Sequence, residues 1–253
     1  MDGSKGIIGG RRDLRVCAAL PPLPRDPSLL DLYGPDAEAE RERAREFLTA
    51  SSHTGLQLEI GFGRGVFLSE LAAAQPQVGF LGFEVRSRNC LELLKRIDRL
   101  GLTNVRMVLA DVRSVSPWLF PDAVVDAVYM LFPDPWWKKR HHKRRLLTPE
   151  TLASLRRIMR PGALFSLKTD VPQTAELADQ SFAATPGFEQ AYPRALDHLP
   201  RSHRERRCLK VGLPVLSRCF KAVPTSEGGG GVHSGGPAQR EQTAFAGREE
   251  RRC

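Results

Sequence analysis

Short apolar runs alternate with longer amphipathic stretches along most of this chain. The apolar runs at 56–60, 78–83, 105–109, 124–131 and 163–167 predict strands, and the segments around Phe188 and at 213–220 add two more. Helical spacing of apolar positions predicts helices at 65–74, 86–100 and 149–159, and the charged stretch 36–48 predicts a surface helix. We expect the Pro161–Gly162 pair to end the last of these helices and turn the chain into the next strand. Repeated strand–helix–strand units with short links predict an α/β protein with a Rossmann-like, doubly wound, mostly parallel sheet and helices on both faces.

The two ends of the chain differ in composition from its middle. Residues 1–27 are rich in Gly, Arg and Pro and predict a flexible lead-in, and residues 224–253 are rich in Gly, Ser, Glu and Arg and predict a disordered tail. One domain is therefore expected at 28–223. No apolar run reaches the roughly 20 residues of a membrane span, and the start of the chain lacks the apolar stretch of a secretory signal. We expect a cytoplasmic protein.

The net charge of +9 is concentrated in two short segments. They are 138–145 (KKRHHKRR) and 201–210 (RSHRERRCLK), and the rest of the chain is close to neutral. Such local concentration is typical of a surface that binds a polyanion, although solvated surface is the simpler alternative. The five cysteines are scattered and form no Cys-x-x-Cys pair, which argues against a disulfide framework or a zinc site. Cys90 is expected to be a small buried residue, and we expect no metal.

The residues that end the predicted strands include a glycine turn and three acids. In a doubly wound sheet, ligands bind at the carboxyl ends of the strands. The first strand ends in Glu59 and Ile60, and Gly61, Gly63 and Gly65 follow at alternate positions. A dinucleotide-binding turn would place its third glycine at the position of Val66. A Gly-x-Gly-x-Gly turn after an acid is instead typical of S-adenosylmethionine binding, with a plain tight turn as the alternative.

The next two strands end in Glu84 and Asp111. A carboxylate at the first position can accept hydrogen bonds from two ribose hydroxyls, and one at the second can accept from an adenine amino group. Either acid could instead cap the following helix. Taken with Glu59 and the glycine turn, the two acids predict an S-adenosylmethionine site.

The fourth strand runs directly into Phe132-Pro133-Asp134-Pro135-Trp136-Trp137 and then into the first basic segment. Prolines on both sides of Asp134 restrict the backbone and hold the carboxylate in place. The tryptophans offer flat faces on which a base can stack, or a hydrophobic lid. This loop is therefore expected to take part in the chemistry.

The segments LEIGFGRG, FPDPWWKKRHHKRR and KTD together resemble the bacterial tRNA (guanine-N7-)-methyltransferase family, whose substrate is the guanine at position 46 of the variable loop. The resemblance covers about 56–220 and implies a class I S-adenosylmethionine-dependent methyltransferase that acts on tRNA. It implies that Asp134 is catalytic and that the cofactor is held by Glu59, Gly61, Gly63, Gly65, Glu84, Asp111 and Asp134. It implies substrate contacts from Lys138, Asp170, Ser202, His203, Arg204 and Glu205, where Ser202 stands in place of the threonine of the family's Thr-x-x-Glu element. It implies RNA contacts from Arg140, His141, His142, Lys143, Arg144 and Arg145.

Two other functions stay open from the sequence. Asp134-Pro135-Trp136 also resembles the Asp-Pro-Pro-aromatic loop of methyltransferases that act on the adenine N6 amino group. The fold could also belong to a catalytically silent tRNA-binding protein, although every expected acid is present. A small-molecule methyltransferase leaves both basic segments unexplained. The sequence leaves open whether the protein is a monomer or a homodimer.

Overall fold

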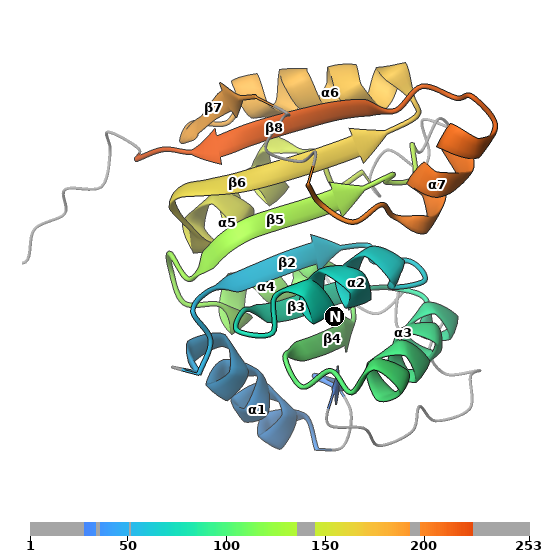
Figure 1. Cartoon of the computed structure of the whole chain (residues 1–253). Helices are drawn as coiled ribbons and strands as arrows, with labels where there is room; N and C mark the ends of the chain where they lie inside the picture. Colours follow the sequence, from blue (N-terminus) through green and yellow to red (C-terminus); the bar gives the residue numbers. More distant parts are fainter. Residues whose placement is uncertain (1–27, 34–35, 51, 136–144, 193–197, 225–253) are drawn as a thin grey trace, which may run out of the picture.

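The computed structural model describes residues 28–33, 36–50, 52–135, 145–192 and 198–224. Within them lies one eight-stranded sheet with the order β1-β4-β3-β2-β5-β6-β8-β7 (Figure 1). The strands from β1 to β6 in this order are parallel, and β8 pairs antiparallel with both of its neighbours, β6 and β7. The strands are β1 (Leu29–Leu30), β2 (Leu56–Ile60), β3 (Gly79–Glu84), β4 (Val105–Leu109), β5 (Val125–Leu131), β6 (Met159–Thr169), β7 (Phe188–Ala191) and β8 (Leu216–Ala222).

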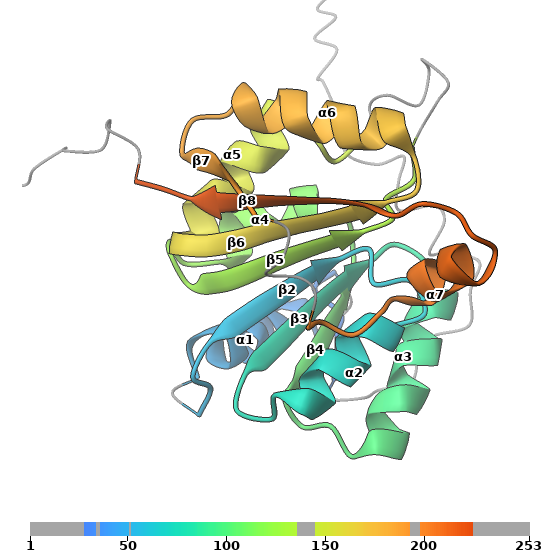
Figure 2. The same cartoon turned by 45° about the horizontal axis from the view of Figure 1, so that its top comes forward.

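Helices cover both faces of the sheet (Figures 1 and 2). One face carries α2 (Val66–Ala74) and α3 (Ser87–Leu100), and the other carries α1 (Ala37–Thr49), α4 (Val112–Leu119), α5 (Pro149–Ile158) and α6 (Pro172–Ala183). Each face has its own hydrophobic cluster, and Phe80 and Leu93 lie in the first while Phe165 and Leu155 lie in the second. The seventh helix, α7 (His203–Lys210), lies apart from both layers, at the end of the sheet where the parallel strands finish. None of the helices in the described part of the chain is long and apolar enough to cross a membrane.

The pattern of apolar positions explains the regular elements. In α3, Cys90, Leu93 and Ile97 face the sheet and are buried, because three- and four-residue spacing places them on one side of the helix. Gly101 ends α3 in the left-handed conformation, with φ of +62°. Thr148 begins α5 by accepting a hydrogen bond from the Thr151 backbone amide.

The predicted fold class and the predicted strands are confirmed. One predicted boundary is wrong, because α5 ends at Ile158 and the Pro161–Gly162 pair lies inside β6. Met159 already pairs with Val125, and the register between β5 and β6 shifts before Ala127 pairs with Leu164. This irregularity accommodates the proline and a glycine at φ of +89° within the strand.

The chain reverses its direction of winding between β2 and β5. From β2 it continues through β3 to β4 on one side, and it returns to β5 on the other side of β2. At such a switch point the loops leaving neighbouring strands separate and form a crevice at their carboxyl ends. The residues that follow β2, β3, β4 and β5 are therefore the ones positioned to bind a ligand.

Candidate active site

The four acids singled out by the sequence end four neighbouring strands. Glu59 lies in β2 opposite Gly82 of β3 and Tyr129 of β5, and Glu84 ends β3 opposite Leu109 of β4. Asp111 follows β4, and Asp134 follows β5. Because these strands are parallel and adjacent, the acids lie side by side at the carboxyl ends of the strands, as the strand pattern predicted.

The glycine turn between β2 and α2 uses the left-handed conformation three times. Gly61, Gly63 and Gly65 have φ values of +74°, +53° and +66°. A side chain at Gly65 would meet Leu93 of α3 at 2.6 Å, whereas one at Gly61 or Gly63 would meet nothing within 4 Å. Gly65 is therefore required for packing, and the backbone at Gly61 and Gly63 borders open space where a ligand can approach closely.

Glu59 is a buried carboxyl group beneath this turn. It is 2% exposed, and its Oε2 atom has no hydrogen-bond partner among the described residues. Burial, together with repulsion from Glu84, raises the pKa of Glu59 from 4.5 to about 8, against the lowering effect of a hydrogen bond from the Leu68 backbone amide. A positively charged ligand in the turn would favour the ionised form of this group.

Glu84 links the end of β3 to the glycine turn. Its Oε2 accepts hydrogen bonds from the Gly63 backbone amide at 3.0 Å and from Asn89 Nδ2 at 3.1 Å. Its Oε1 accepts from the backbone amides of Val85 at 2.8 Å and Arg86 at 3.0 Å. Both carboxylate oxygens are thus engaged by the protein, so a ribose diol would have to share or displace some of these donors.

Asp111 begins α4, as the alternative interpretation expected. Its side chain accepts from the Arg113 backbone amide at 3.0 Å and also contacts the Arg113 guanidinium. The carboxylate is about one third exposed, so one part of it faces solvent beside the ends of β3 and β4. Helix capping does not exclude a contact with a ligand, and the adenine contact stays a prediction.

Asp134 is the most exposed of the four acids. Its side chain is 57% exposed, and its Oδ2 lies 3.4 Å from Arg86 of the β3–α3 loop. The loop leaves β5 through Phe132, which has φ of +54° and donates its backbone amide to the carbonyl of Lys168 at 2.7 Å. A left-handed phenylalanine is unusual, and the hydrogen bond to β6 holds the chain in this bend.

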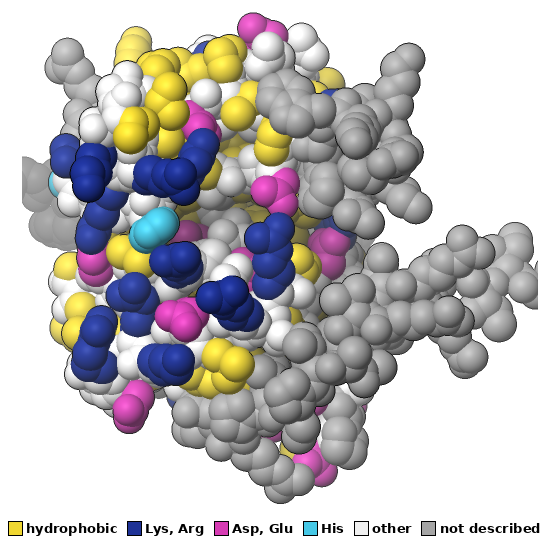
Figure 3. All heavy atoms as spheres, turned by 90° about the vertical axis from the view of Figure 1, so that its right-hand side faces the viewer, with side chains coloured by type: hydrophobic (Ala, Val, Ile, Leu, Met, Phe, Trp, Pro, Cys, Tyr) yellow, Lys and Arg dark blue, Asp and Glu magenta, His cyan; other side chains and the backbone are white. Residues whose placement is uncertain are grey.

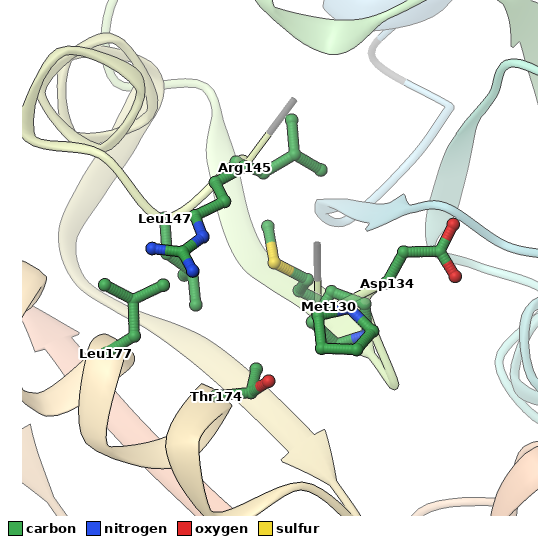
Figure 4. Close-up of a pocket in the computed structure, with 9 residues that line it drawn as sticks. Met130, Asp134, Arg145, Leu147, Thr174 and Leu177 are labelled. Atoms are coloured by element: carbon green, nitrogen blue, oxygen red, sulfur yellow. The ribbon is translucent and has the colours of Figure 1, made fainter. Parts of the chain in front are cut away.

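A small pocket lies beside the same loop (Figure 4). Its lining residues are Met130, Pro133, Asp134, Pro135, Arg145, Leu146, Leu147, Thr174 and Leu177. The Asp134 carboxylate points away from Arg145 and Thr174, so Asp134 borders this pocket while its charged group faces elsewhere (Figure 4). The contact with Arg86 places that group on the β3 side of the loop.

The segment Lys168-Thr169-Asp170 at the end of β6 binds α7. Lys168 Nζ donates to Glu205 Oε1 at 2.7 Å, and the two side chains are only 10% and 8% exposed. Arg204 pairs with Asp170. Burial opposes the charge of Asp170, but hydrogen bonds from Arg204 and from its own backbone amide outweigh burial and hold its pKa below the ordinary value. The structure thus brings Asp170, Arg204 and Glu205 together, and their contact with substrate stays a prediction.

Ser202 supports this arrangement by beginning α7. Its hydroxyl accepts from the Glu205 backbone amide at 3.2 Å, which is the cap that a threonine at this position would also form. Glu205 Oε2 has no partner among the described residues. No role was predicted for Lys168 of the KTD segment, although its position at the end of a strand, like that of the acids, was the available signal.

Several predicted residues lie outside the described part of the chain. They are Lys138, Arg140, His141, His142, Lys143 and Arg144, together with Trp136 and Trp137, the lead-in at 1–27 and the tail from 225. Of the predicted RNA contacts only Arg145 is described, and it is partly buried beside the pocket. The described residues contain no group of three or more His, Cys, Asp or Glu side chains suited to a metal ion. Cys90 is buried, as expected.

Comparisons with known proteins agree on a methyltransferase family. Residues 53–216 match the family model described as "Putative methyltransferase". A tRNA (guanine-N(7)-)-methyltransferase of Marinobacter nauticus is 39% identical over 170 residues, which cover 65% of this chain and 71% of that protein. One from Synechococcus sp. (strain JA-3-3Ab) is 38% identical over 163 residues, covering 63% of this chain and 69% of that protein.

Solved structures with the same fold include other methyltransferases. The antibiotic-resistance methyltransferase Kmr aligns with a TM-score of 0.52 at 21% identity, covering 74% of this chain and 94% of that one. The 16S rRNA (adenine(1408)-N(1))-methyltransferase from Catenulisporales acidiphilia aligns with a TM-score of 0.50 at 21% identity, covering 81% of this chain and 96% of that one. At these identities the likeness shows the fold alone.

Proposed function

Because the chain belongs to the tRNA (guanine-N7-)-methyltransferase family, we propose that it transfers a methyl group from S-adenosylmethionine to N7 of guanine 46 in tRNA. The observation that best supports this proposal is the placement of Glu59, Glu84, Asp111 and Asp134 at the ends of four adjacent strands around an open glycine turn. We propose that residues 28–223 form the catalytic domain. We also propose that the protein acts in the cytoplasm, as a monomer or a homodimer.

The residues of the turn fit S-adenosylmethionine. Open space borders Gly61 and Gly63, and the buried Glu59 carries an oxygen without a partner among the described residues. Glu84 and Asp111 would hold the ribose and the adenine. When bound, S-adenosylmethionine supplies a methyl group made electrophilic by a positively charged sulfur. The acids of the site favour a ligand of that charge through their electrostatic field.

Guanine N7 requires little proton chemistry from the protein. Its lone pair lies in the plane of the ring and is available at neutral pH, so positioning and electrostatics provide most of the catalysis. Methylation gives the purine a positive charge, and the exposed carboxylate of Asp134 can stabilise that charge as it develops. The N1–H and N2 amino groups of guanine are donors, so Asp134 or Asp170 can accept from them and exclude adenine.

The tRNA would be held by the basic segment that follows Asp134. Lys138 would contact the substrate, and Arg140, His141, His142, Lys143, Arg144 and Arg145 would contact the RNA. Position 46 lies within the folded core of tRNA, so exposing the base costs a few kcal/mol. Contacts between these cations and phosphates can offset that cost through the release of counterions.

The test is a methylation assay with defined RNA. The purified chain is incubated with an unmodified tRNA transcript and labelled S-adenosylmethionine, and the product nucleoside is identified by mass spectrometry. We expect 7-methylguanosine with the parent transcript and none with a transcript that carries adenine at position 46. Methylation of an adenine amino group, or tRNA binding without any methyl transfer, would overturn the proposal.

A pair of variants tests the role of Asp134. We expect Asp134→Asn to abolish methylation and leave the thermal unfolding curve unchanged, because this side chain is mostly exposed. Asp98→Asn is the matched control, since Asp98 is an exposed aspartate on α3 that lies away from the strand ends. Equal activity of the two variants would refute the catalytic role.

A further inference from the structure

Four arginines from three separate elements lie close enough to His203, at the start of α7, to act on its charge. Arg64 comes from the glycine turn, Arg96 from α3, and Arg206 and Arg207 from α7. We call these four arginines and His203 the α7 cationic face. All belong to the side of the molecule where the parallel strands end, and Figure 3 shows Lys and Arg side chains gathered there. Two of the four arginines lie outside the segment 201–210, so the sequence alone did not connect them.

Contacts between the elements hold this face together. Arg96 Nε donates to the backbone carbonyl of Arg64 at 3.0 Å, which ties α3 to the glycine turn. Arg206 pairs with Glu70 of α2, which ties α7 to the helix that follows the same turn. The relative positions of the arginines are therefore set by the fold, and only their side-chain ends are free to rearrange.

The arginines outnumber the acids that neutralise them. Among the described residues, Glu70 is the one carboxylate that pairs with a member of the face, and the exposed guanidinium groups of Arg64 and Arg207 pair with none. Burial and then the charges of Arg64, Arg207, Arg96 and Arg206 lower the pKa of His203, which indicates a positive potential at this point. Exposed unpaired guanidinium groups are suited to phosphate, because their planar donors match its oxygens.

We propose that the α7 cationic face binds backbone phosphates of tRNA, as an anchoring surface in addition to the basic segment 138–145. This inference rests on the proposed function. Arg64 stands between Gly63 and Gly65, so a phosphate held there lies next to the cofactor turn. The RNA backbone would thus be fixed on the α2–α3 side of the carboxyl ends of the strands.

The experiment measures binding of unmodified tRNA, without cofactor, to the full chain over a series of salt concentrations. The test variant is Arg64→Gln with Arg207→Gln, since neither side chain makes an ion pair among the described residues. Arg99→Gln is the control, because Arg99 is an exposed arginine on α3 that is not among the charges acting on His203. A single Arg207→Gln variant is also measured. Because Arg207 lies outside the glycine turn, this variant separates a loss of phosphate contacts from a change in the turn caused by replacing Arg64.

We expect the double variant to bind tRNA at least tenfold more weakly at about 0.1 M salt, and its plot of log affinity against log salt to be shallower by about 1 to 2. Arg207→Gln should show about half of the change in slope, and Arg99→Gln none. An unchanged affinity and slope in the double variant, or an equal loss in Arg99→Gln, would overturn the inference. If the unaltered chain methylates tRNA in that case, the proposed function still stands, whereas absence of methylation by the unaltered chain would overturn the function itself.

Discussion

The buried carboxyl group of Glu59 leads us to predict how the free energy of unfolding depends on pH. It is almost fully enclosed, receives one hydrogen bond from the Leu68 amide, and lies near the negative charge of Glu84. These surroundings favour the protonated form in the folded chain, while in the unfolded chain the group is free to ionise near pH 4.5. Glu59→Gln is the informative change, because glutamine has nearly the same shape and stays neutral at every pH.

The direction of the effect follows from proton binding. Because the pKa of Glu59 is raised to about 8 on folding, the folded state binds more protons than the unfolded state between pH 4.5 and 8. Glu59 therefore lowers the free energy of unfolding as the pH rises through this window, and the full loss is reached above pH 8. A change in pKa from 4.5 to about 8 corresponds to a loss on the order of 5 kcal/mol, which water entering the turn would reduce.

The assay is urea-induced unfolding of the unaltered chain and of Glu59→Gln at pH 5.5, 7.0 and 8.5. We expect the difference in unfolding free energy to shift in favour of the variant by several kcal/mol between the lowest and the highest pH. Comparing the two proteins cancels the titration of the groups that do not interact with Glu59. A difference that stays constant within about 0.5 kcal/mol over this range would show that Glu59 is ionised in the folded protein and would refute the reasoning.

Two further predictions concern packing at the same edge of the sheet. Lys168→Met leaves the buried Glu205 carboxylate unpaired and should lower the unfolding free energy by about 3 kcal/mol. The double variant with Glu205→Leu should lose less unfolding free energy than the two single variants combined, and additive losses in urea unfolding would argue against a coupled pair. Gly65→Ala should lower the unfolding free energy by about 2–4 kcal/mol, because alanine is strained in the left-handed conformation and its Cβ would clash with Leu93. Gly61→Ala should lower it by only about 1–2 kcal/mol, because that Cβ would be strained but would meet open space. Equal losses of thermal stability would contradict the role assigned to Leu93.

The end of the sheet that bears the acids could be predicted because each acid lies within an apolar run, near its end, or shortly after one. The run ending at Leu109 identifies a buried strand, and the parallel arrangement then places Asp111 beside Glu84. The contact of Glu84 with Gly63 could not be read in this way, because it depends on backbone geometry within the loops, whereas the helix cap formed by Asp111 was one of the two interpretations of that residue.

Two of the helices that the sequence did not predict, α4 and α7, have weak patterns for physical reasons. Pro117 lies inside α4, where a proline ordinarily argues against a helix. In α7 only Glu205 and Cys208 are buried, so the helix has no apolar stripe by which to recognise it. The helix is positioned by ion pairs instead, and these join residues far apart in the chain. A lysine such as Lys168 therefore resembles any solvated lysine until the structure shows its partner.

The ion pairs of α7 also determine how it can contribute to the site. Lys168 and Asp170 hold it to β6, on one side of the switch point, and Glu70 holds it to α2, on the other. Moving α7 away would break all three of these ion pairs at once. An element that is bound to both halves of the sheet in this way forms a wall of the crevice. The geometry that α7 gives to Glu205 and to the arginines around His203 is accordingly present before any RNA binds, and binding need not supply the energy to build it.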